Sequence, residues 1–312
     1  MPVVEITNLT KDYTSGSFFK KAIRALDHLT LNIEDKEIFG LIGPNGAGKT
    51  TTIKLLMGLI FPTQGEARIL ERPAGDVTTK RYVSYLPENP YFYDYLTGRE
   101  LLDYFGQLFG MSRSDRRDRI ESLLRRVDLS DSADLQLRKY SKGMIQRLGI
   151  AQAILNRPKI AFLDEPMSGL DPMGRRDMTL LIQELRDDGV TVVFSSHILP
   201  DVESLCDRVA ILNKGKLVRE GRLTEILDVS VEAIEVVVLD LPSELESRLQ
   251  GRAQRMRRLG RRSRIEFKDA AEVDEALELL RSNGVRLVSV NPVKQTLEEY
   301  FVREVQAEGG AP

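Results

Sequence analysis

The stretch Gly43-Pro44-Asn45-Gly46-Ala47-Gly48-Lys49-Thr50-Thr51 decides the fold. It follows an apolar run at 38–42 that is typical of a buried strand, and it precedes residues 52–57, whose apolar side chains have helical spacing. A phosphate-binding loop requires this context of strand, glycine-rich turn and helix start. The glycines let backbone N–H groups point at phosphate oxygens, and the helix N-terminus adds partial positive charge. We expect Lys49 to reach the outer phosphates of a nucleoside triphosphate and Thr50 to ligate Mg²⁺.

The composition is that of an ordinary globular protein. The 312 residues, 42% hydrophobic and 29% charged, suffice for one large domain and a smaller one. A formal net charge of -2 gives no general attraction to nucleic acid or to an acidic membrane. The single Cys206 excludes an intramolecular disulfide and suits a reducing cytoplasm. No apolar run is long enough for a transmembrane helix and the N-terminus lacks a signal-peptide pattern, so we expect another subunit to supply any membrane-spanning part.

Apolar periodicity predicts an α/β domain with a helical insertion. The expected strands are 3–9 (as an edge strand), 25–33, 38–42, 81–86, 159–163 and 190–195, with a closing hairpin at 208–212 and 216–219. The expected helices after the glycine-rich loop are 98–110, 114–127, 142–156 and 173–187, and 13–17 is expected to be a loop. We assign 1–222 to this domain and about 89–157 to its helical subdomain.

The composition changes after about residue 223. The expected order is strand 232–239, helix 243–250, strands 253–259 and 262–268, helix 270–282, strand 285–290 and helix 294–305. This β-α-β-β-α-β order is typical of a ferredoxin-like α+β module, which we expect at 223–312 as an accessory or regulatory domain.

Arginines crowd the expected hairpin of this module: Arg252, Arg255, Arg257, Arg258, Arg261, Arg262 and Arg264. Strand alternation would place some of them on one exposed face. They either form a solvated edge protected by charge, or they contact anionic lipid headgroups or a partner's cytoplasmic loops. Nucleic acid is not expected, because no aromatic residue is interleaved for stacking.

A second chemical signal follows the expected strand at 159–163. That strand delivers Asp164 to its carboxyl end, where Mg²⁺ held by Thr50 would lie in a doubly wound sheet. Glu165 comes next and can polarise a water for in-line attack on the γ-phosphate. The pair therefore predicts triphosphate hydrolysis, whereas the alternative is a solvated acidic turn.

Several segments together resemble the ATPases of ABC transporters. Asp164-Glu165-Pro166-Met167-Ser168-Gly169-Leu170-Asp171-Pro172 resembles their Walker B segment and D-loop. Tyr140-Ser141-Lys142-Gly143-Met144 resembles their signature motif, and Ser195-Ser196-His197 resembles their switch histidine. Tyr13 matches the aromatic residue that stacks on adenine, and all segments occur in family order over roughly 3–220.

The resemblance implies an ABC ATPase of the P-loop class that clamps ATP and Mg²⁺ between two subunits. It gives Ser141 and Gly143 a contact with the γ-phosphate bound by the opposite protomer, although Ser141 alone reads equally well as a helix cap. It gives His197 a contact with the same phosphate. The implied catalytic residues are Glu165, His197 and Lys49. The implied nucleotide-binding residues are Tyr13, Gly43, Pro44, Asn45, Gly46, Ala47, Gly48, Lys49, Thr50, Thr51, Ser141 and Gly143.

The sequence departs from the family pattern in two places. Glu88 stands where the family usually has a glutamine that touches Mg²⁺ and the attacking water. We place Glu88 with Thr50 and Asp164 in the implied metal set, to which its carboxylate adds negative charge near the phosphates. Lys142 and Met144 replace a glycine and the glutamine of the signature. Both departures are familiar in stand-alone ATPases of bacterial exporters for drugs, ions, lipids and polysaccharides.

The resemblance therefore implies the ATP-binding subunit of a bacterial ABC exporter. Its expected partners are integral membrane permease subunits and a second ATPase, either another copy or a relative, at the cytoplasmic face of the inner membrane. The alternative is a soluble ABC ATPase that acts on ribosomes or DNA, but the chain has one cassette and no sustained heptads. A P-loop kinase would leave the signature-like and D-loop-like segments unexplained.

Overall fold

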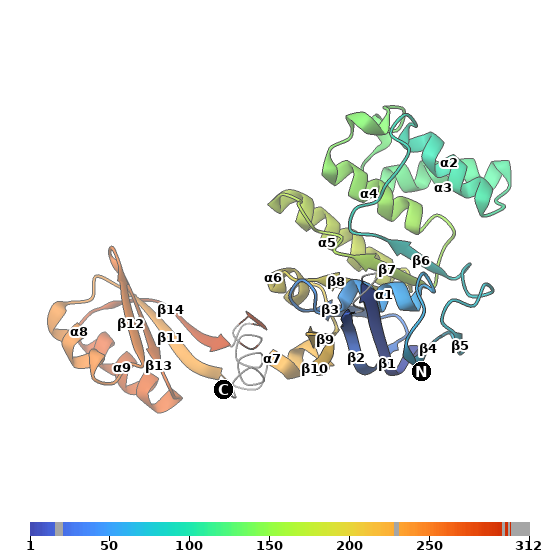
Figure 1. Ribbon diagram of the computed structural model, residues 1–312. Helices are drawn as coiled ribbons and strands as arrows, with labels where there is room; N and C mark the ends of the chain where they lie inside the picture. Colours follow the sequence, from blue (N-terminus) through green and yellow to red (C-terminus); the bar gives the residue numbers. More distant parts are fainter. Residues whose placement is uncertain (16–20, 228–230, 295–296, 299, 301–312) are drawn as a thin grey trace. The chain divides into compact units, whose positions relative to one another are not determined.

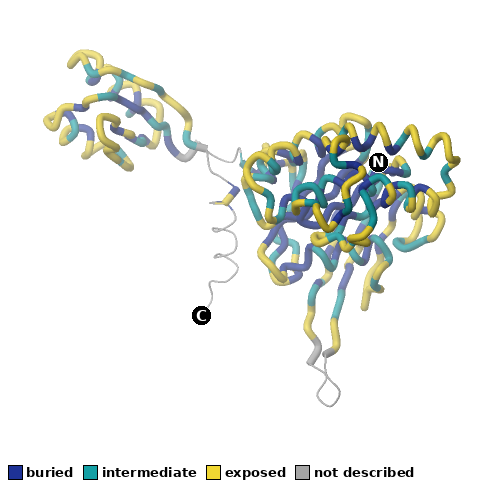
Figure 2. Tube along the Cα trace, turned by 90° about the horizontal axis from the view of Figure 1, so that it is seen from above, coloured by how far each residue is buried: buried dark blue, intermediate teal, exposed yellow. Residues whose placement is uncertain are grey.

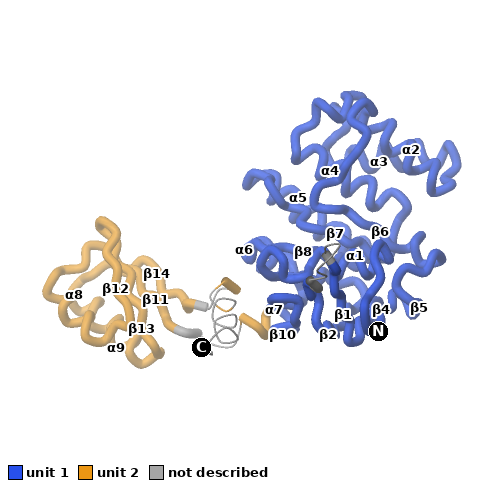
Figure 3. Tube along the Cα trace, viewed as in Figure 1, with its two compact units in different colours: residues 1–223 blue, residues 224–312 orange. Residues whose placement is uncertain are grey.

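The computed structural model describes residues 1–15, 21–227, 231–294, 297–298 and 300. The chain divides into two compact units, Met1–Leu223 and Thr224–Pro312 (Figure 3). Among the described residues, no helix combines the length and the apolar character that crossing a bilayer requires.

An antiparallel sheet forms one layer of the N-terminal unit. Its strand order is β2-β1-β4-β5. The strands are β1 (Pro2–Ser15), β2 (Lys21–Glu34), β4 (Gln64–Ile69) and β5 (Arg72–Pro73). Residues 3–9 are therefore not at an edge, because β4 covers the free side of β1. The expected loop at 13–17 is also wrong as far as Ser15, since β1 continues to that residue; positions 16–17 lie outside the described residues.

A six-stranded sheet with the order β10-β9-β3-β8-β7-β6 forms the second layer. Its strands are β3 (Ile38–Ile42), β6 (Val83–Leu86), β7 (Ile160–Asp164), β8 (Thr191–Ser196), β9 (Arg208–Asn213) and β10 (Lys216–Arg222). All neighbours except β9 and β10 run parallel. The expectation of buried parallel strands is confirmed, since every residue of β3, β7 and β8 is buried.

The helix α1 (Lys49–Leu56) lies between the two sheets. Its Ile53 and Leu56 join a core that also contains Leu29 from the first sheet and Phe162 from the second. Figure 2 shows this buried interior within exposed loops. Burying such a side chain contributes about 1.5–3 kcal/mol, so the core fixes the helix start against the sheet.

Of the helices that follow α1, α4 (Lys142–Ala153), α5 (Pro172–Asp187) and α6 (Leu199–Glu203) pack against the six-stranded sheet. The helices α2 (Gly98–Leu108) and α3 (Arg113–Arg126) pack against α4. The short helix α7 (Leu223–Leu227) begins at the boundary between the two units, and 3₁₀ turns occur at Ser130–Ser132 and Leu137–Lys139. Figure 1 shows α2, α3 and α4 gathered on the side of the unit away from β1 and β2. The predicted helical insertion is confirmed, and α2 begins with a capping box between Thr97 and Glu100.

The C-terminal unit has the predicted order of elements. It contains β11 (Val231–Leu239), α8 (Ser243–Gln250), β12 (Arg255–Leu259), β13 (Arg262–Phe267), α9 (Ala270–Ser282) and β14 (Arg286–Lys294). The antiparallel sheet has the order β12-β13-β11-β14, as a split βαβ unit requires. The helix expected at 294–305 falls largely outside the described residues, although 297–298 and 300 are helical.

Candidate functional site

The glycine-rich loop connects β3 to α1. Gly43 has φ 153°, and a Cβ there would lie 2.2 Å from the Leu212 carbonyl oxygen. Gly48, the N-cap of α1, has φ 108°, and a Cβ would lie 2.8 Å from the Ala25 carbonyl oxygen. Only glycine fits at these two positions, and the loop is thereby held at the helix start. At Gly46 a Cβ would meet nothing within 4 Å, so this part of the loop borders open space.

Lys49 is buried at the base of the loop, with 5% of the residue exposed. Its Nζ donates to the Gly43 carbonyl oxygen at 2.7 Å and to the Pro44 carbonyl oxygen at 3.4 Å. It also lies 3.2 Å from Glu165 Oε1. A fixed, partly desolvated ammonium group of this kind attracts anions more strongly than an exposed lysine does.

Three hydroxyl groups surround Asp164, which is 2% exposed. Thr50 Oγ1 donates to Asp164 Oδ1 at 3.0 Å, and Ser195 Oγ donates to the same oxygen at 2.6 Å. Tyr85 OH donates to Oδ2 at 3.5 Å. Burial and the negative charge of Asp164 raise the pKa of Tyr85 well above its usual range, so Tyr85 stays protonated and keeps donating.

Strand register brings these groups together. β7 and β8 pair Asp164 with Ser195, and β3 and β8 pair Ile42 with Ser196. The carboxyl ends of three neighbouring strands therefore meet at the glycine-rich loop.

Glu165 and His197 stand beside this cluster. His197 Nδ1 lies 2.9 Å from Glu165 Oε2, so the two carboxylate oxygens of Glu165 face His197 and Lys49. Glu165 has a left-handed backbone (φ 49°), and its N–H donates to Ser195 Oγ at 2.9 Å. A non-glycine residue in this region is strained, and the fixed turn aims the carboxylate at the lysine.

A depression of about 340 Å³ is lined by most of the residues that the sequence predicts for the nucleotide site. Its lining comprises residues 45–51 of the loop together with Glu88, Glu165 and His197, and it also includes Ile23, Arg24 and Ala25. The last three were not predicted from the sequence. Tyr13 does not line it, but Tyr13 pairs with Ile23 across the β1–β2 hairpin and is 39% exposed. An exposed ring beside the mouth of the depression can stack on a flat ligand.

Glu88 links this depression to the helical subdomain. Gln146 of α4 is 1% exposed, and its Nε2 donates to the Glu88 carbonyl oxygen at 2.9 Å. A buried amide that bonds a backbone carbonyl ties the two segments together, because losing that bond would leave buried polar groups without partners. Glu88 therefore lines the depression, and its backbone carbonyl is bonded to α4.

Ser141 and Gly143 do not line the depression. Ser141 is the N-cap of α4, and its Oγ accepts from the Met144 N–H at 3.2 Å. A Cβ at Gly143 would lie 3.6 Å from Leu170, and one at Gly169 would lie 2.5 Å from Lys142 Nζ. The signature-like and D-loop-like segments therefore pack against each other, and the helix N-terminus with its cap is exposed.

The residues present fit a magnesium–triphosphate ligand. The open loop at Gly46, the helix N-terminus and the buried Lys49 suit phosphate oxygens. Thr50 Oγ1 and Asp164 Oδ1, 3.0 Å apart, are the hard oxygen donors that Mg²⁺ prefers.

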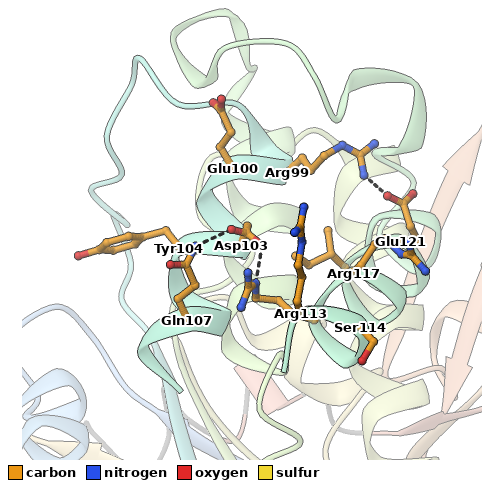
Figure 4. Close-up of a pocket in the computed structure, with 11 residues that line it drawn as sticks. Arg99, Glu100, Asp103, Tyr104, Gln107, Arg113, Ser114, Arg117 and Glu121 are labelled. Carbon is orange, nitrogen blue, oxygen red and sulfur yellow. Dashed lines mark hydrogen bonds and ion pairs between the residues drawn. The ribbon is translucent and has the colours of Figure 1, made fainter. Parts of the chain in front are cut away.

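A larger hollow of about 1000 Å³ lies between α2 and α3 (Figure 4). Two ion pairs join residues of its lining, Arg99 with Glu121 and Arg116 with Asp103. None of the predicted site residues lines it. It is therefore distinct from the nucleotide depression.

Known proteins resemble this chain along most of its length. A family model described as ABC transporter matches residues 26–168. An ABC transporter ATP-binding protein of Synechocystis sp. is 41% identical over 98% of this chain and 86% of its own. The bacitracin transport ATP-binding protein BcrA of Bacillus licheniformis is 32% identical over 96% of each chain.

Solved structures of ABC ATP-binding proteins are similar to the larger part of the chain. The structure of an ATP-binding subunit of an ABC transporter has a TM-score of 0.64 and 33% identity, covering 72% of this chain and 91% of its own. A dimeric ATP-binding cassette in a post-hydrolysis state, bound to ADP and Pi, has a TM-score of 0.64 and 29% identity over 70% of this chain and 98% of its own.

Proposed function

This chain belongs to the family of ABC transporter ATP-binding proteins and is an ATPase, and we propose that it powers a bacterial exporter as a subunit separate from the membrane permease. Two ATPase subunits, either two copies or this chain and a relative, would close around ATP and open after hydrolysis. The proposed location is the cytoplasmic face of the inner membrane, on integral permease subunits. A role in transport is supported by the similarity to BcrA, whose name describes bacitracin transport, and export is the direction that we propose.

We assign the predicted residues as follows. The loop from Gly43 to Thr51 cradles the phosphates, and Lys49 neutralises the outer ones. Thr50 and Asp164 hold Mg²⁺, which when bound would neutralise charge on the phosphates. The contact of Tyr85 with Asp164 adds a supporting hydroxyl to this set.

Glu165 acts as the general base for the attacking water, and His197 orients Glu165 and contacts the terminal phosphate. The 2.9 Å contact of His197 with Glu165 supports this pairing. A positioned base contributes about 10²–10⁴-fold to the rate. Tyr13 stacks on adenine, with Ile23 and Ala25 beside it as apolar neighbours.

One observation carries the dimer proposal: the depression holds the loop, Glu165 and His197, but neither Ser141 nor Gly143. Within one chain the signature-like segment has its own helix N-terminus exposed and away from this lining. Two chains arranged head to tail would bring the Ser141 hydroxyl and the N-terminus of α4 to the phosphates of the other copy. The site is then complete only in the dimer, so nucleotide binding controls the distance between subunits.

Glu88 is proposed to pass this motion to the permease. Its backbone bond to Gln146 joins the phosphate site to α4, the helix that begins at Ser141. A movement of α4 therefore displaces Glu88 and the segment after it, which leads into α2 and α3. The outer surface of that helical subdomain is the proposed contact with the membrane subunits.

The decisive experiment is purification of the tagged chain from detergent-solubilised membranes of its own host. We expect a multi-span membrane protein to co-purify, and we expect proteoliposomes of the complex to hydrolyse ATP faster than the isolated chain does. Recovery with ribosomes or DNA, in place of a membrane protein, would overturn the exporter proposal and leave the ATPase assignment intact.

A further inference from the structure

Among the described residues of the C-terminal unit, α8 and α9 cover one face of the sheet. Val236, Ile265 and Phe267 of the sheet pack with Val273 and Leu280 of α9 in a single core. Because successive side chains of a strand point to opposite faces, the alternate residues point away from the helices. This uncovered face carries most of the arginines of the hairpin.

The structure divides the arginine run into two groups. Arg252, Arg258 and Arg261 each form an ion pair within the unit, with Glu275, Glu246 and Asp240 respectively. The second group lies on the uncovered face, and we call it the basic face. It comprises Arg255, Arg257, Arg262, Arg264 and Arg286, all exposed.

The basic face is poor in counter-charge. Glu235 and Glu266 are the acidic residues that share it within the described part of the unit, and Arg264 lies 3.6 Å from Glu235. The other four arginines have no ion-pair partner among the described residues. Register places Arg257 directly opposite Arg264 on the neighbouring strand. Like charges directly opposite each other are destabilising, so an external anion would relieve the repulsion.

The hairpin tip adds an apolar side chain to this face. Leu259 pairs with Arg262 at the end of the two strands and is 60% exposed. The turn between them consists of Gly260, with φ 62°, and Arg261. An exposed leucine among arginines matches an interface that offers both phosphate groups and hydrocarbon.

We propose that the basic face docks on a bilayer that contains anionic phospholipid, with the arginines at the headgroups and Leu259 at the hydrocarbon boundary. Positive and negative side chains lie on opposite sides of the unit, which would orient it on an anionic surface. Helix α9, on the covered side of the sheet, exposes Asp274 and Glu278 in addition to Glu275, which is paired with Arg252. An anionic surface therefore attracts the basic face and repels the helical side.

Other occupants fit less well. Single-stranded nucleic acid binds open sheets through aromatic side chains, and the described residues of this face include none. A second copy packed on the same face would bring arginines against arginines. The inference goes beyond the proposed function and is tested without a permease, so either can fail alone.

The test is co-sedimentation of the full chain with vesicles of phosphatidylcholine and phosphatidylglycerol, and with vesicles of phosphatidylcholine alone. We expect binding to the anionic vesicles only, and loss of binding at high salt, where the Debye length falls from about 10 Å to about 3 Å. The triple variant Arg255→Gln/Arg257→Gln/Arg262→Gln should bind about a hundredfold more weakly, since each arginine near such a surface contributes about fivefold.

The matched control is Arg252→Gln/Arg258→Gln/Arg261→Gln, which removes the same charge from the ion-paired group. It should retain vesicle binding within about fivefold, and both triple variants should keep the wild-type ATPase rate. Absence of wild-type binding to anionic vesicles, or equal losses in both triple variants, overturns the proposal. Tighter binding to homopolymer RNA than to vesicles at the same salt overturns it in favour of nucleic acid.

Discussion

Lys49 and Glu165 form a buried ion pair, in which Nζ lies 3.2 Å from Oε1 and the side chains are 6% and 10% exposed. The same carboxylate contacts His197 through its other oxygen. A charge pair removed from water is favourable only when its geometry is good, and removing one member leaves the other without compensation. The three side chains therefore act as one unit, and substitutions in it must be isosteric to be informative.

Glu165→Gln keeps the shape of the side chain and removes its charge. We expect steady-state ATP hydrolysis to fall by about 10²–10⁴-fold, because the general base is lost. ATP binding, measured with a fluorescent analogue, should persist, since the loop and Lys49 remain. Glu37→Gln is the matched control: Glu37 is also buried and paired with an arginine, Arg208, but lies outside the depression. Near wild-type hydrolysis by the Glu165 variant would remove this residue from the base role.

Ser195 is predicted to position the metal site without touching the nucleotide. Its hydroxyl donates to Asp164 and accepts from the Glu165 N–H. Ser195→Ala should raise the Mg²⁺ concentration needed for half-maximal hydrolysis by about 10–100-fold, the usual effect of losing a group that holds a metal ligand.

Ser196→Ala is the neighbouring control, because that hydroxyl accepts from the Ile198 N–H and does not contact Asp164. It should leave the Mg²⁺ dependence unchanged. Equal effects of the two alanine variants would contradict the positioning role of Ser195.

Glu88→Gln tests whether the acidic side chain contributes to metal binding. If Glu88 helps Thr50 and Asp164 to hold Mg²⁺, the variant should need about tenfold more Mg²⁺, which corresponds to about 1.4 kcal/mol. Thr50→Val, which loses a hydroxyl 3.0 Å from Asp164, serves as the positive reference. An unchanged Mg²⁺ titration for Glu88→Gln, beside a shifted one for Thr50→Val, would remove Glu88 from the metal set and leave its backbone link to Gln146 as its contribution.

Much of the fold could be predicted because buried parallel strands leave a plain apolar signal. The strand 159–163 is an example, since β7 is buried throughout. The strand β4 was missed because, of its six residues, only Ala67 and Ile69 are buried and Gly65 interrupts the pattern. A strand that is mostly exposed has little periodicity to detect, and β1 therefore looked like an edge strand.

The predicted site residues were found from spacing, but their neighbours depend on register. Ile23 and Ala25 reach the depression because β2 pairs with β1 over a long antiparallel hairpin. Ser195 contacts Asp164 because two strands, about thirty residues apart in sequence, align at their ends. Such long-range pairings are set by tertiary packing and carry no local signature in the chain.

Ser141→Ala separates the two roles of the serine at the start of α4. Its Oγ caps the helix, and losing a cap costs about 0.5–2 kcal/mol. Ser112 caps α3 in the same way, by accepting from the Asp115 N–H, so Ser112→Ala carries a comparable cap loss away from the nucleotide. We expect both variants to lower the melting temperature, and only Ser141→Ala to abolish ATP-dependent dimerisation in the Glu165→Gln background. The measurement is size-exclusion chromatography with and without ATP. If dimers persist with Ser141→Ala, this serine acts only as a helix cap. The proposed contact of Ser141 with the nucleotide bound by the other subunit would then be wrong.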